Sequence, residues 1–466
     1  MSDKLEIISP IDGSVYAERP LASRENALDA VRQASKAQRA WRRTPISERQ
    51  AVLSNAVDRI LAERDDIAHE LAWQMGRPVS QGPGEVGGFE ERARYMIDLA
   101  PQALADIDPG DKPGFRRFIR REPVGVVFTI APWNFPYMTA VNSIWPALAA
   151  GNAVILKHAK QTTLTGERLE RVLAEAGLPD GLFRSLPMSH ETAAAVMQDE
   201  AVRLVCFTGS VNGGHAVQKA LASGSGFAGA GLELGGKDPA YVRADADPAH
   251  AAAGLADGAF FNAGQSCCSI ERIYVHEAVY DDFVDALVAE ARGLKLGNPL
   301  DAGTTLGPMV TPRAADFVRG QIADAVDQGA RALVDPADYP AAGGAYLPPQ
   351  VLVDVDHSMR AMTEETFGPL AGVMKVSSDD EAVELMNDSE FGLTAAIWTD
   401  DVDAAEQLGE RIDTGTVFMN RCDYLDPALA WAGVKHTGRG CTLSVVGYEQ
   451  MTRPKSFHLK LRTPEE

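Results

Sequence analysis

The sequence predicts an α/β fold with parallel sheets, and three observations point to this class. Its 466 residues, 45% of them hydrophobic, are enough for two or three packed units with a large apolar core. From residue 124 onward, short and nearly continuous apolar runs with β-branched side chains have the composition of buried parallel strands. Helical stretches separate these runs, which is the alternation that right-handed crossovers between parallel strands require.

The first third of the chain is predicted to be helical. Within TPISERQAVLSNAVDRILAERDDIAHELA (44–72), apolar side chains recur at helical spacing at Leu53, Val57, Ile60, Leu61, Ile67 and Leu71. Ser47 followed by Gln50 has the capping-box pattern, so we expect Ser47 to cap the start of this helix.

Four apolar runs are the predicted strands of the parallel sheets. They are VGVVFTIA (124–131), NAVILK (152–157), RLVCFTG (203–209) and RIYVH (272–276). Between them, TLTGERLERVLAEAG (163–177) is expected to form a helix. The basic segment FRRFIRREP (115–123) is expected to be an exposed strand or hairpin. Because such folds bind ligands at the carboxyl ends of their strands, residues at those ends are the candidates for function.

Composition argues against several classes of protein. The formal net charge of −21 repels polyanions, so nucleic acid is not an expected partner. No apolar run reaches the ~18 residues of a membrane span and MSDKLEIISP lacks the order of a signal peptide, so no membrane association is expected. Five cysteines without regular spacing suit a reducing compartment, which predicts a cytoplasmic location. The usual spacings of metal ligands do not occur, so no metal site is expected.

Chemistry-bearing residues follow several of the predicted strands. PWNFP holds Asn134 between two prolines, and NAVILK brings Lys157 to the end of its strand. The glycines of TGSVNGG would let a backbone and a helix N-terminus approach a phosphate. Glu233 follows in LELGGKDP and Cys267 in GQSC. Each residue alone has an ordinary structural explanation, but a carboxylate, a thiol, a fixed amide and a glycine loop together indicate an active site.

These motifs, in this order, resemble the aldehyde dehydrogenase superfamily over nearly the whole chain. The matching stretches are ISPIDGSV, PWNFP, VILK, FTGS, LELGGK, GQSC, EETFGP, FGLTAAIWT, GTVFMN and AGVKHTGRG. The resemblance implies a Rossmann-like cofactor domain (1–104 and 125–232), an α/β catalytic domain (233–425) and a small β oligomerisation element (105–124 and 445–466). That element would pair DKPGFRRFIRREP with the C-terminal RPKSFHLKL in a homodimer or homotetramer.

The resemblance also implies the reaction, an NAD(P)-dependent oxidation of an aldehyde to a carboxylic acid. In the pattern G-Q-x-C the nucleophile is Cys267, whereas its neighbour Cys268 is expected to line the pocket. Asn134 would stabilise the oxyanion of the thiohemiacetal. Glu233 would act as general base for hydrolysis of the thioester, and its presence favours a free acid over an acyl-coenzyme A product.

The cofactor contacts implied by the resemblance contain two departures from the family pattern. Lys160 stands where relatives that prefer NAD have a glutamate, and PMSHET (187–192) lacks the usual glycine. An ammonium at that place favours a 2′-phosphate, so we predict that NADP is accepted at least as well as NAD. The matching residues are Ile130, Pro132, Trp133, Lys157, Lys160, Gly209, Ser210, Gly214, Leu234, Gly235, Glu365 and Phe367.

The substrate is less determined than the chemistry. The resemblance places Arg421 near a tunnel lined by Asn142, Ser143, Ser266, Cys268, Asp423, Tyr424 and Trp431. Arg421 could bind a carboxylate and Asp423 an amine, or the two could pair with each other. We expect a small to medium aliphatic aldehyde or semialdehyde. Two alternatives stay open: a binding or structural protein of the same fold, and a succinic-semialdehyde-type enzyme with a different carboxylate anchor.

Overall fold

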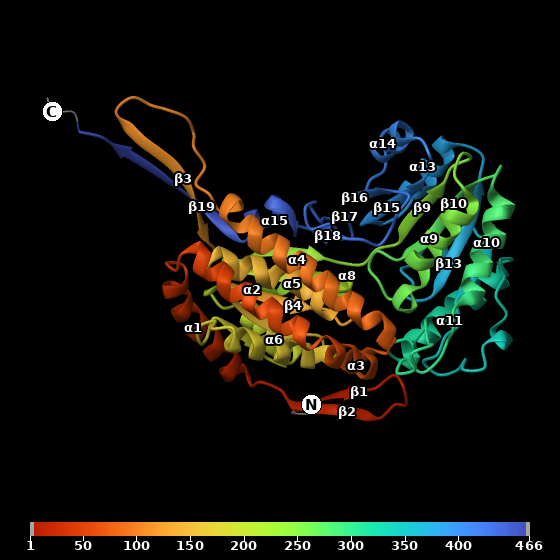
Figure 1. The fold of residues 1–466 in the computed structure, drawn as a ribbon, viewed down its shortest axis with the longest axis horizontal. Coiled ribbons are helices and arrows are strands. Elements are labelled where there is room, and N and C mark those ends of the chain that lie inside the picture. The colour runs from red at the N-terminus through yellow and green to blue at the C-terminus, as the bar shows by residue number, and fades with distance from the viewer. Residues whose placement is uncertain (1–3, 463–466) are drawn as a thin grey trace.

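Two sheets of mainly parallel strands lie side by side, and a two-stranded arm projects from one end of the molecule (Figure 1). The computed structural model describes residues 4–462. The predicted α/β class is confirmed, because the central strands of both sheets pair in parallel. In the part of the chain that is described, no helix is both long and apolar enough to cross a lipid bilayer.

The N-terminal part forms a hairpin followed by a layer of helices. The hairpin pairs β1 (Lys4–Ile8) with β2 (Val15–Pro20) in antiparallel register. The helices are α1 (Arg24–Trp41), α2 (Ile46–Ala62), α3 (Arg64–Met75) and α4 (Gly82–Ala103), with the short η1 (Val79–Gln81) before α4.

The single helix predicted over residues 44–72 is wrong in one respect, because the chain turns at Glu63. This residue ends α2 and precedes α3. Its carboxylate accepts hydrogen bonds from Arg168 and Arg171 of α6 (Thr163–Glu175), which holds the turn against the next layer.

The predicted cap at Ser47 is also wrong. Helix α2 begins at Ile46, one residue earlier, and Pro45 precedes it without a side-chain cap. Gln50 takes a tertiary contact instead and donates its side-chain amide to the carbonyl of Ile97 on α4 at 2.7 Å. A proline just before a helix is already suited to its first turn, so the capping box is not needed.

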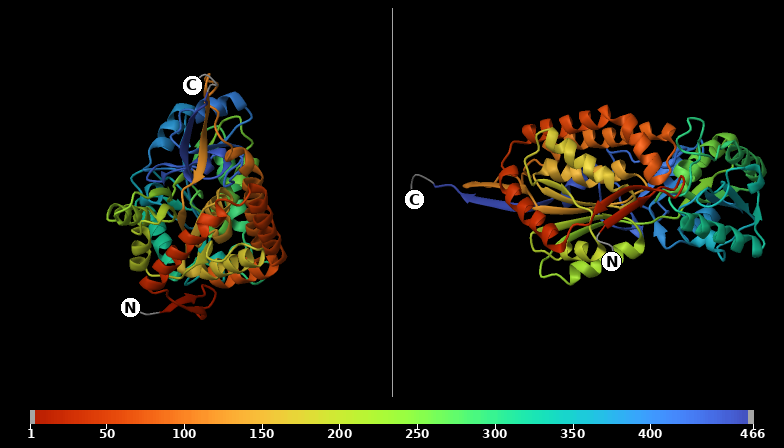
Figure 2. Two further views of the ribbon diagram at one scale, coloured as in Figure 1. Left: turned by 90° about the vertical axis from the view of Figure 1, so that its left-hand side faces the viewer. Right: turned by 90° about the horizontal axis from the view of Figure 1, so that it is seen from below.

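The first sheet has its strands in the order β18, β8, β7, β4, β5, β6. After β4, the chain adds β5 and β6 on one side of it and then β7 and β8 on the other, so the strand order reverses beside β4. In open α/β sheets, such a reversal forms a crevice that binds ligands. Helices lie on both faces of this sheet (Figure 2). The bounds are β4 (Val126–Ala131), α5 (Pro136–Ala150), β5 (Ala153–His158), η2 (Lys160–Thr162), β6 (Phe183–Ser185), α7 (His190–Met197), β7 (Val202–Thr208), α8 (Val211–Ala222), β8 (Gly229–Glu233) and β18 (Gly438–Arg439).

Late residues of the chain complete the first sheet. β18 pairs antiparallel with β8, and α15 (Ser444–Gln450) packs on α4 and α5. The segment 426–444, which the predicted domain ranges leave unassigned, therefore contributes to the first sheet.

The second sheet has seven strands in the order β11, β12, β13, β10, β9, β15, β16. All neighbours in it are parallel except β11 and β12. Its elements are β9 (Asp238–Val242), α9 (Pro248–Phe260), η3 (Phe261–Gly264), β10 (Ile270–His276), α10 (Tyr280–Gly293), α11 (Pro312–Asp327), β11 (Arg331–Ala332), η4 (Pro336–Asp338), β12 (Gln350–Val353), α12 (Arg360–Thr363), β13 (Leu370–Val376), α13 (Asp379–Asn387), β15 (Thr394–Trp398), α14 (Val402–Gly409) and β16 (Thr416–Met419). A small pair, β14 (Phe391–Gly392) and β17 (Val434–Lys435), lies outside both sheets.

The arm pairs two segments that are far apart in the sequence. β3 (Phe115–Pro123) and β19 (Thr452–Lys460) are antiparallel over their full length, which confirms the predicted pairing of FRRFIRREP with RPKSFHLKL. The rings of Phe118 and Phe457 stack across it at 4.4 Å. Residues 1–3 and 463–466 of the predicted domain ranges lie outside the described residues.

Candidate active site

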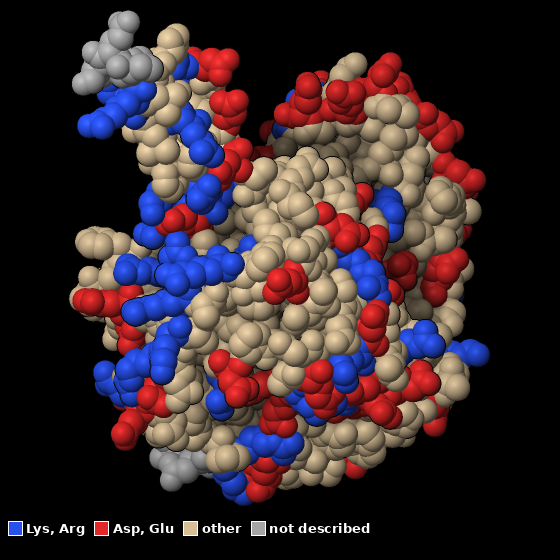
Figure 3. All heavy atoms as spheres, turned by 60° about the vertical axis from the view of Figure 1, so that its left-hand side comes forward, with Lys and Arg blue, Asp and Glu red and all other residues tan. Residues whose placement is uncertain are grey.

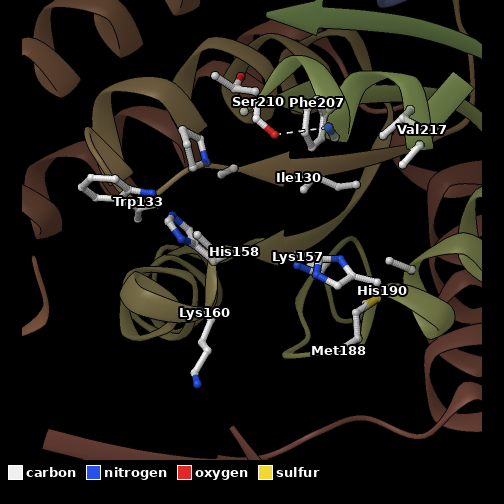
Figure 4. Close-up of a pocket in the computed structure, with 18 of the residues that line it drawn as sticks. Ile130, Trp133, Lys157, His158, Lys160, Met188, His190, Phe207, Ser210 and Val217 are labelled. Atoms are coloured by element: carbon white, nitrogen blue, oxygen red, sulfur yellow. Dashed lines mark hydrogen bonds between the residues drawn. The ribbon is translucent and has the colours of Figure 1, made fainter. Parts of the chain in front are cut away.

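A cavity of about 760 Å³ opens where the carboxyl ends of β4, β5 and β7 face the loop before β10. Figure 4 shows the wall that β4, β5, β7 and α8 contribute, with Ile130, Lys157 and Phe207 labelled. A cavity of this size is in the range of small-molecule and cofactor sites. Cys267 and Asn134 line it together with the predicted cofactor residues Ile130, Pro132, Trp133, Lys157, Lys160, Gly209, Ser210, Leu234, Gly235, Glu365 and Phe367. The cavity therefore brings the predicted nucleophile and oxyanion donor to the predicted cofactor site.

The loop that carries Cys267 is held in an unusual backbone conformation. Asn262, Ala263 and Gly264 all have φ between 52° and 66°, the left-handed region that non-glycine residues rarely adopt. A side chain at Gly264 would collide with the carbonyl of Gly368, because the two loops meet backbone to backbone. Such local strain persists only where the surroundings enforce it, and here it places Cys267 before β10 instead of at the carboxyl end of a strand.

The two adjacent cysteines have different surroundings. Cys267 is partly exposed and lines the cavity. Cys268 is 2% exposed, and its Sγ donates to the Asp423 carboxylate at 2.8 Å. The pKa of Cys268 is raised well above its usual range, first by its contact with Cys267 and then by burial. Cys267 is therefore the cysteine that a ligand in the cavity can reach.

Gln265 and Asn134 connect the cysteine loop to the first sheet. Asn134 donates its side-chain amide to the carbonyl of Gln265 at 3.2 Å, two residues before Cys267. Gln265 itself accepts from the backbone N–H of Val310 at 2.8 Å and donates to the carbonyl of Asn262 at 3.0 Å. These bonds explain the glutamine of the G-Q-x-C pattern, because its side chain fixes the loop from inside.

A buried arginine that sequence reasoning missed supports the same loop. Arg77, 1% exposed, donates to the backbone carbonyl of Asn134 at 2.5 Å and to the side chain of Asn262 at 3.2 Å. It forms an ion pair with Glu85, which also accepts from the N–H of Tyr137 at the start of α5. Glu85 occupies a position of α4 that faces the core. A charged residue at such a position needs a buried partner, and this was the sequence signal that could have indicated the pair.

Glu233 lies beside the cavity lined by Cys267, and in the described structure no hydrogen bond joins the two residues. It ends β8 and lines a small adjoining cavity of about 20 Å³ together with Asn142. Its carboxylate accepts from the hydroxyls of Thr208 at 3.0 Å and Thr442 at 2.6 Å. Burial raises the pKa of Glu233, and the two hydroxyl bonds oppose this rise. The structure thus places a carboxyl group of raised pKa in a cavity that adjoins the one lined by Cys267.

The N-terminus of α8 faces the cavity with a glycine-rich first turn. Ser210 caps the helix by accepting from the N–H of Gly213 at 3.2 Å, and both residues line the cavity. A side chain at Gly213 would collide with the ring of Phe207, a lining residue that the sequence did not indicate. The predicted contact at Gly214 does not line the cavity, because that glycine packs on Leu234. A helix N-terminus of this kind binds phosphate groups.

The loop with Glu365 and Phe367 closes the other end of the cavity. Glu365 accepts from the N–H of Gly236 at 3.1 Å, and burial raises its pKa to about 7. Phe367 contacts Trp133 edge to face at 5.6 Å. The buried pair of Lys237 and Glu271 holds this loop, since Glu271 accepts from the N–H of Phe367 at 2.9 Å.

The end of the cavity beside β5 and α7 is basic. Lys157, Lys160 and His190 line it, and among the described lining residues Glu365, at the opposite end, is the only carboxylate. Burial lowers the pKa of Lys157. Lys160 is exposed, and in Figure 4 its ammonium extends away from the labelled Lys157 and His190. His190 was missed because it lies in the segment that departs from the family pattern.

The predicted tunnel residues form two groups. Asn142 and Ser143 line the small cavity with Glu233. Asp423 accepts from Cys268 and, at 3.3 Å, from Ser266.

The possible pairing of Arg421 with Asp423 is not formed. The Arg421 guanidinium lies instead over the ring of Tyr424 at 3.5 Å, and Tyr424 donates to Glu91 of α4 at 2.5 Å. Trp431 is buried and bridges to the backbone of Thr442. In the part of the chain that is described, no three His, Cys, Asp or Glu side chains are grouped to hold a metal ion.

Comparison with known proteins identifies relatives along the whole chain. Residues 1–457 match the family model described as "Aldehyde dehydrogenase family". Phenylacetaldehyde dehydrogenase from Pseudomonas fluorescens is 34% identical over 467 residues, which cover 98% of this chain and 93% of the relative. Succinate-semialdehyde dehydrogenase [NADP(+)] from Mycobacterium avium is 34% identical over 417 residues, covering 89% and 87%. The crystal structure of aldehyde dehydrogenase from Brucella melitensis biovar abortus 2308 superimposes with a TM-score of 0.94 at 32% identity, covering 99% of this chain and 94% of that one.

Proposed function

The chain belongs to the aldehyde dehydrogenase family, and on this premise we propose that Cys267, Asn134 and Glu233 carry out the oxidation of an aldehyde to its carboxylic acid. The observation that carries the assignment is the position of Cys267, which opens on the cofactor-sized cavity beside Asn134 while Cys268 is buried. The protein is an oxidoreductase that acts on aldehydes.

The residues present fit a nicotinamide dinucleotide. Ser210 and the N-terminus of α8 would hold its pyrophosphate, the basic end its adenosine part, and Glu365 a ribose hydroxyl. A side chain at Gly213 would collide with Phe207, and one at Gly235 would collide with Glu365. The two glycines therefore keep the cofactor cavity open. When bound, the nicotinamide supplies the acceptor for the hydride that the substrate carbon loses.

The chain's own residues handle the other steps. The Cys267 thiolate attacks the aldehyde carbon, and the second N–H of the Asn134 amide stabilises the oxyanion that forms. After oxidation the acyl group remains on Cys267 as a thioester. Glu233 then takes a proton from water, which attacks the thioester and releases the acid and the thiolate. For this step Glu233 must act through a water or leave its two threonine partners, because it does not touch the thiol.

Absorbance of the reduced cofactor at 340 nm with a panel of aldehydes tests the proposal. Turnover that depends on Cys267 is the expected result. A wild-type protein that reduces neither NAD nor NADP with any aldehyde would overturn it.

We propose that NADP is used at least as well as NAD. Basic residues that include Lys157, Lys160 and His190 line the adenosine end, and no carboxylate there would repel a 2′-phosphate among the described lining residues. The Mycobacterium avium relative is named as an NADP(+) enzyme, which agrees with this preference.

We propose that the protein assembles as a homodimer or homotetramer through residues 105–124 and 445–462. An isolated two-stranded hairpin is marginally stable in water, yet this arm projects freely and β19 pairs only with β3 among the described strands (Figure 1). The arm carries basic side chains such as Arg116 and Arg120 along β3, whereas α13 and α14 of the other lobe carry acidic ones such as Asp380 and Asp403. Figure 3 shows basic groups toward the arm and acidic groups along the rim of the other lobe. Sedimentation should give a dimer or tetramer, and a chain that ends at Met451 should be monomeric. Wild-type monomers at micromolar concentration would contradict the assembly.

The five free cysteines also support a reducing compartment, and we propose the cytoplasm.

A further inference from the structure

A buried arginine outside the machinery described above lies where α4 packs on α5, the helix that follows Asn134. Arg92 on α4 is 7% exposed, and its one hydrogen bond in the described structure runs from Nη1 to the carbonyl of Met138 at 2.6 Å. Among residues 4–462, no carboxylate oxygen lies within 4.0 Å of its guanidinium nitrogens. A buried guanidinium normally has an ionic partner, so its remaining donors are available to a ligand.

The acidic groups near Arg92 already have other partners. Burial lowers the pKa of Arg92, and the charges of Glu85, Cys268, Glu233 and Asp423 partly oppose this. Glu85 pairs with Arg77, Glu233 accepts from two threonines, and Asp423 accepts from Cys268 and Ser266. Arg92 therefore experiences the charges of Glu233 and of Asp423 in the predicted tunnel, and in the described structure no ion pair with either of them neutralises it.

A second unpartnered group lies on the neighbouring helix. Asn142 of α5 follows Met138 by one helical turn, so the two residues share a face of α5. The side chain of Asn142 is 3% exposed, and neither its Oδ1 nor its Nδ2 has a hydrogen-bond partner. It lines the small cavity beside Glu233. A buried amide without partners is unfavourable, and a bound ligand or water would satisfy it.

We propose that Arg92, assisted by Asn142, binds the carboxylate of an aldehyde acid, so that the substrate class is the semialdehydes. The inference rests on the proposed function and deepens it. With Nη1 bonded to Met138, the Nε and Nη2 edge of the guanidinium is left, and this edge takes a carboxylate side-on through two parallel hydrogen bonds. Asn142 adds a donor from the adjacent helix. Arg421, the anchor considered from sequence, stacks on Tyr424 at the surface and is not needed for this role.

Three aldehydes of equal chain length separate the effect of tail charge from that of fit. Succinic semialdehyde carries an anionic tail, butanal a neutral methyl group, and 3-aminopropanal a cationic tail. The wild-type kcat/KM should be at least about 10-fold higher for succinic semialdehyde than for butanal, with 3-aminopropanal lowest, because a well-formed ionic hydrogen bond is worth a factor of this order.

Variants test whether Arg92 causes this order. Arg92→Gln should lower kcat/KM for succinic semialdehyde at least about 10-fold, mainly through KM, and leave butanal within about threefold, because only the anionic tail uses the guanidinium. Arg94→Gln, on the same helix with exposed pairs to Asp58 and Glu90, is the matched control and should keep the wild-type order. Asn142→Ala should raise the KM for succinic semialdehyde by a smaller factor.

The outcomes distinguish a failure of the proposed role of Arg92 from a failure of the proposed aldehyde oxidation. Two results would refute a role of Arg92 in binding the carboxylate without affecting the proposed aldehyde oxidation. One is a wild-type kcat/KM for butanal equal to that for succinic semialdehyde. The other is an unchanged ratio of these two kcat/KM values in Arg92→Gln. Equal losses of kcat/KM for both aldehydes in Arg92→Gln, with normal thermal unfolding, would also refute this role. They would show that Arg92 supports the structure of the site and does not bind the carboxylate of the substrate. If Arg92→Gln does not fold, the test uses the ratio of kcat/KM for succinic semialdehyde and butanal in the wild type and in Arg92→Lys. No turnover of any aldehyde overturns the proposed function, and the role of Arg92 with it.

Discussion

The side-chain amide of Asn134 donates to the carbonyl of Gln265 across 3.2 Å, and this bond joins the first sheet to the loop of Cys267. The donor follows β4, whereas the acceptor precedes β10 in the second sheet. The cavity that we assign to cofactor and substrate therefore has one wall from each sheet. The active site depends on how the two lobes dock, and the predictions below test its parts.

Replacing the two cysteines singly should separate their roles. Cys267→Ala should abolish turnover, because the nucleophile is lost, whereas Cys268→Ala should retain most of it, because that thiol is buried against Asp423. Steady-state rates at 340 nm measure both. Equal losses, or the reverse order, would assign the chemistry to the wrong thiol.

Cofactor binding should strengthen as pH rises through about 7. Burial raises the pKa of Glu365 to about 7, and a ribose hydroxyl donates to the carboxylate form, so binding favours the deprotonated group and releases a proton. The dissociation constant for NAD, which has no 2′-phosphate that titrates near pH 6, should therefore fall between pH 6 and pH 8 and level off above. In Glu365→Gln the constant should be larger and independent of pH over this range. A pH dependence that survives this substitution would rule out Glu365 as its source.

The pH profile of steady turnover should respond to Thr442. Burial raises the pKa of Glu233, and the hydroxyls of Thr442 and Thr208 partly oppose this rise. Removal of one hydroxyl in Thr442→Val should therefore raise the pKa of Glu233 further. Because the base must be deprotonated, the acid limb of the kcat profile should move to higher pH. Thr129→Val is the control, since Thr129 lines the same cavity but bonds to Ser143. Identical profiles in wild type and Thr442→Val would remove Glu233 from the step that limits kcat.

Lys160→Glu should shift cofactor preference toward NAD. The substitution replaces an attraction for the 2′-phosphate by a repulsion at the basic end of the cavity. A change of about 10-fold in the ratio of kcat/KM for NADP and NAD corresponds to about 1.4 kcal/mol, which is reasonable for an exposed group that can swing toward a dianion. A wild type that strongly prefers NAD, with a ratio that the substitution does not alter, would contradict this assignment.

Breaking the buried pair of Arg77 and Glu85 should destabilise the protein. Arg77→Met leaves Glu85 as an unpaired buried charge, which costs about 3–5 kcal/mol. Arg94→Met, which removes only exposed pairs, should cost under about 1 kcal/mol. Urea midpoints measure both, and Arg77→Met with Glu85→Gln should recover part of the loss. A midpoint for Arg77→Met that equals that of Arg94→Met would show that the pair is not needed.

Local patterns in the sequence were sufficient for the strands and for the motif residues. The runs predicted at 124–131, 152–157, 203–209 and 272–276 are β4, β5, β7 and β10, because a continuous apolar run is what a buried parallel strand needs. The motif residues that follow them were predictable because turns after strands present side chains to the same edge of a sheet. Cys267 was found by its motif and not by topology, since it precedes its strand.

Long-range pairings could not be predicted in the same way. Glu63 breaks the first helical stretch because of arginines about a hundred residues later, and Gln50 bonds to α4 instead of capping α2. Glu233 is separated from Cys267 because threonines distant in sequence hold it. The isolation of Arg92 depends on how α4 packs against α5, which periodicity does not specify.

The most direct test of the central claim is to locate the acyl group on the protein during turnover. Glu233→Gln should form the thioester in a first burst of reduced cofactor and hydrolyse it slowly, so the acyl-enzyme should accumulate. Acid quench, digestion and mass spectrometry of the peptide that contains both cysteines then show which one carries the acyl mass. The account predicts the acyl group on Cys267 in nearly every modified peptide. An acyl group on Cys268, or rapid turnover with no acylated peptide, would contradict it.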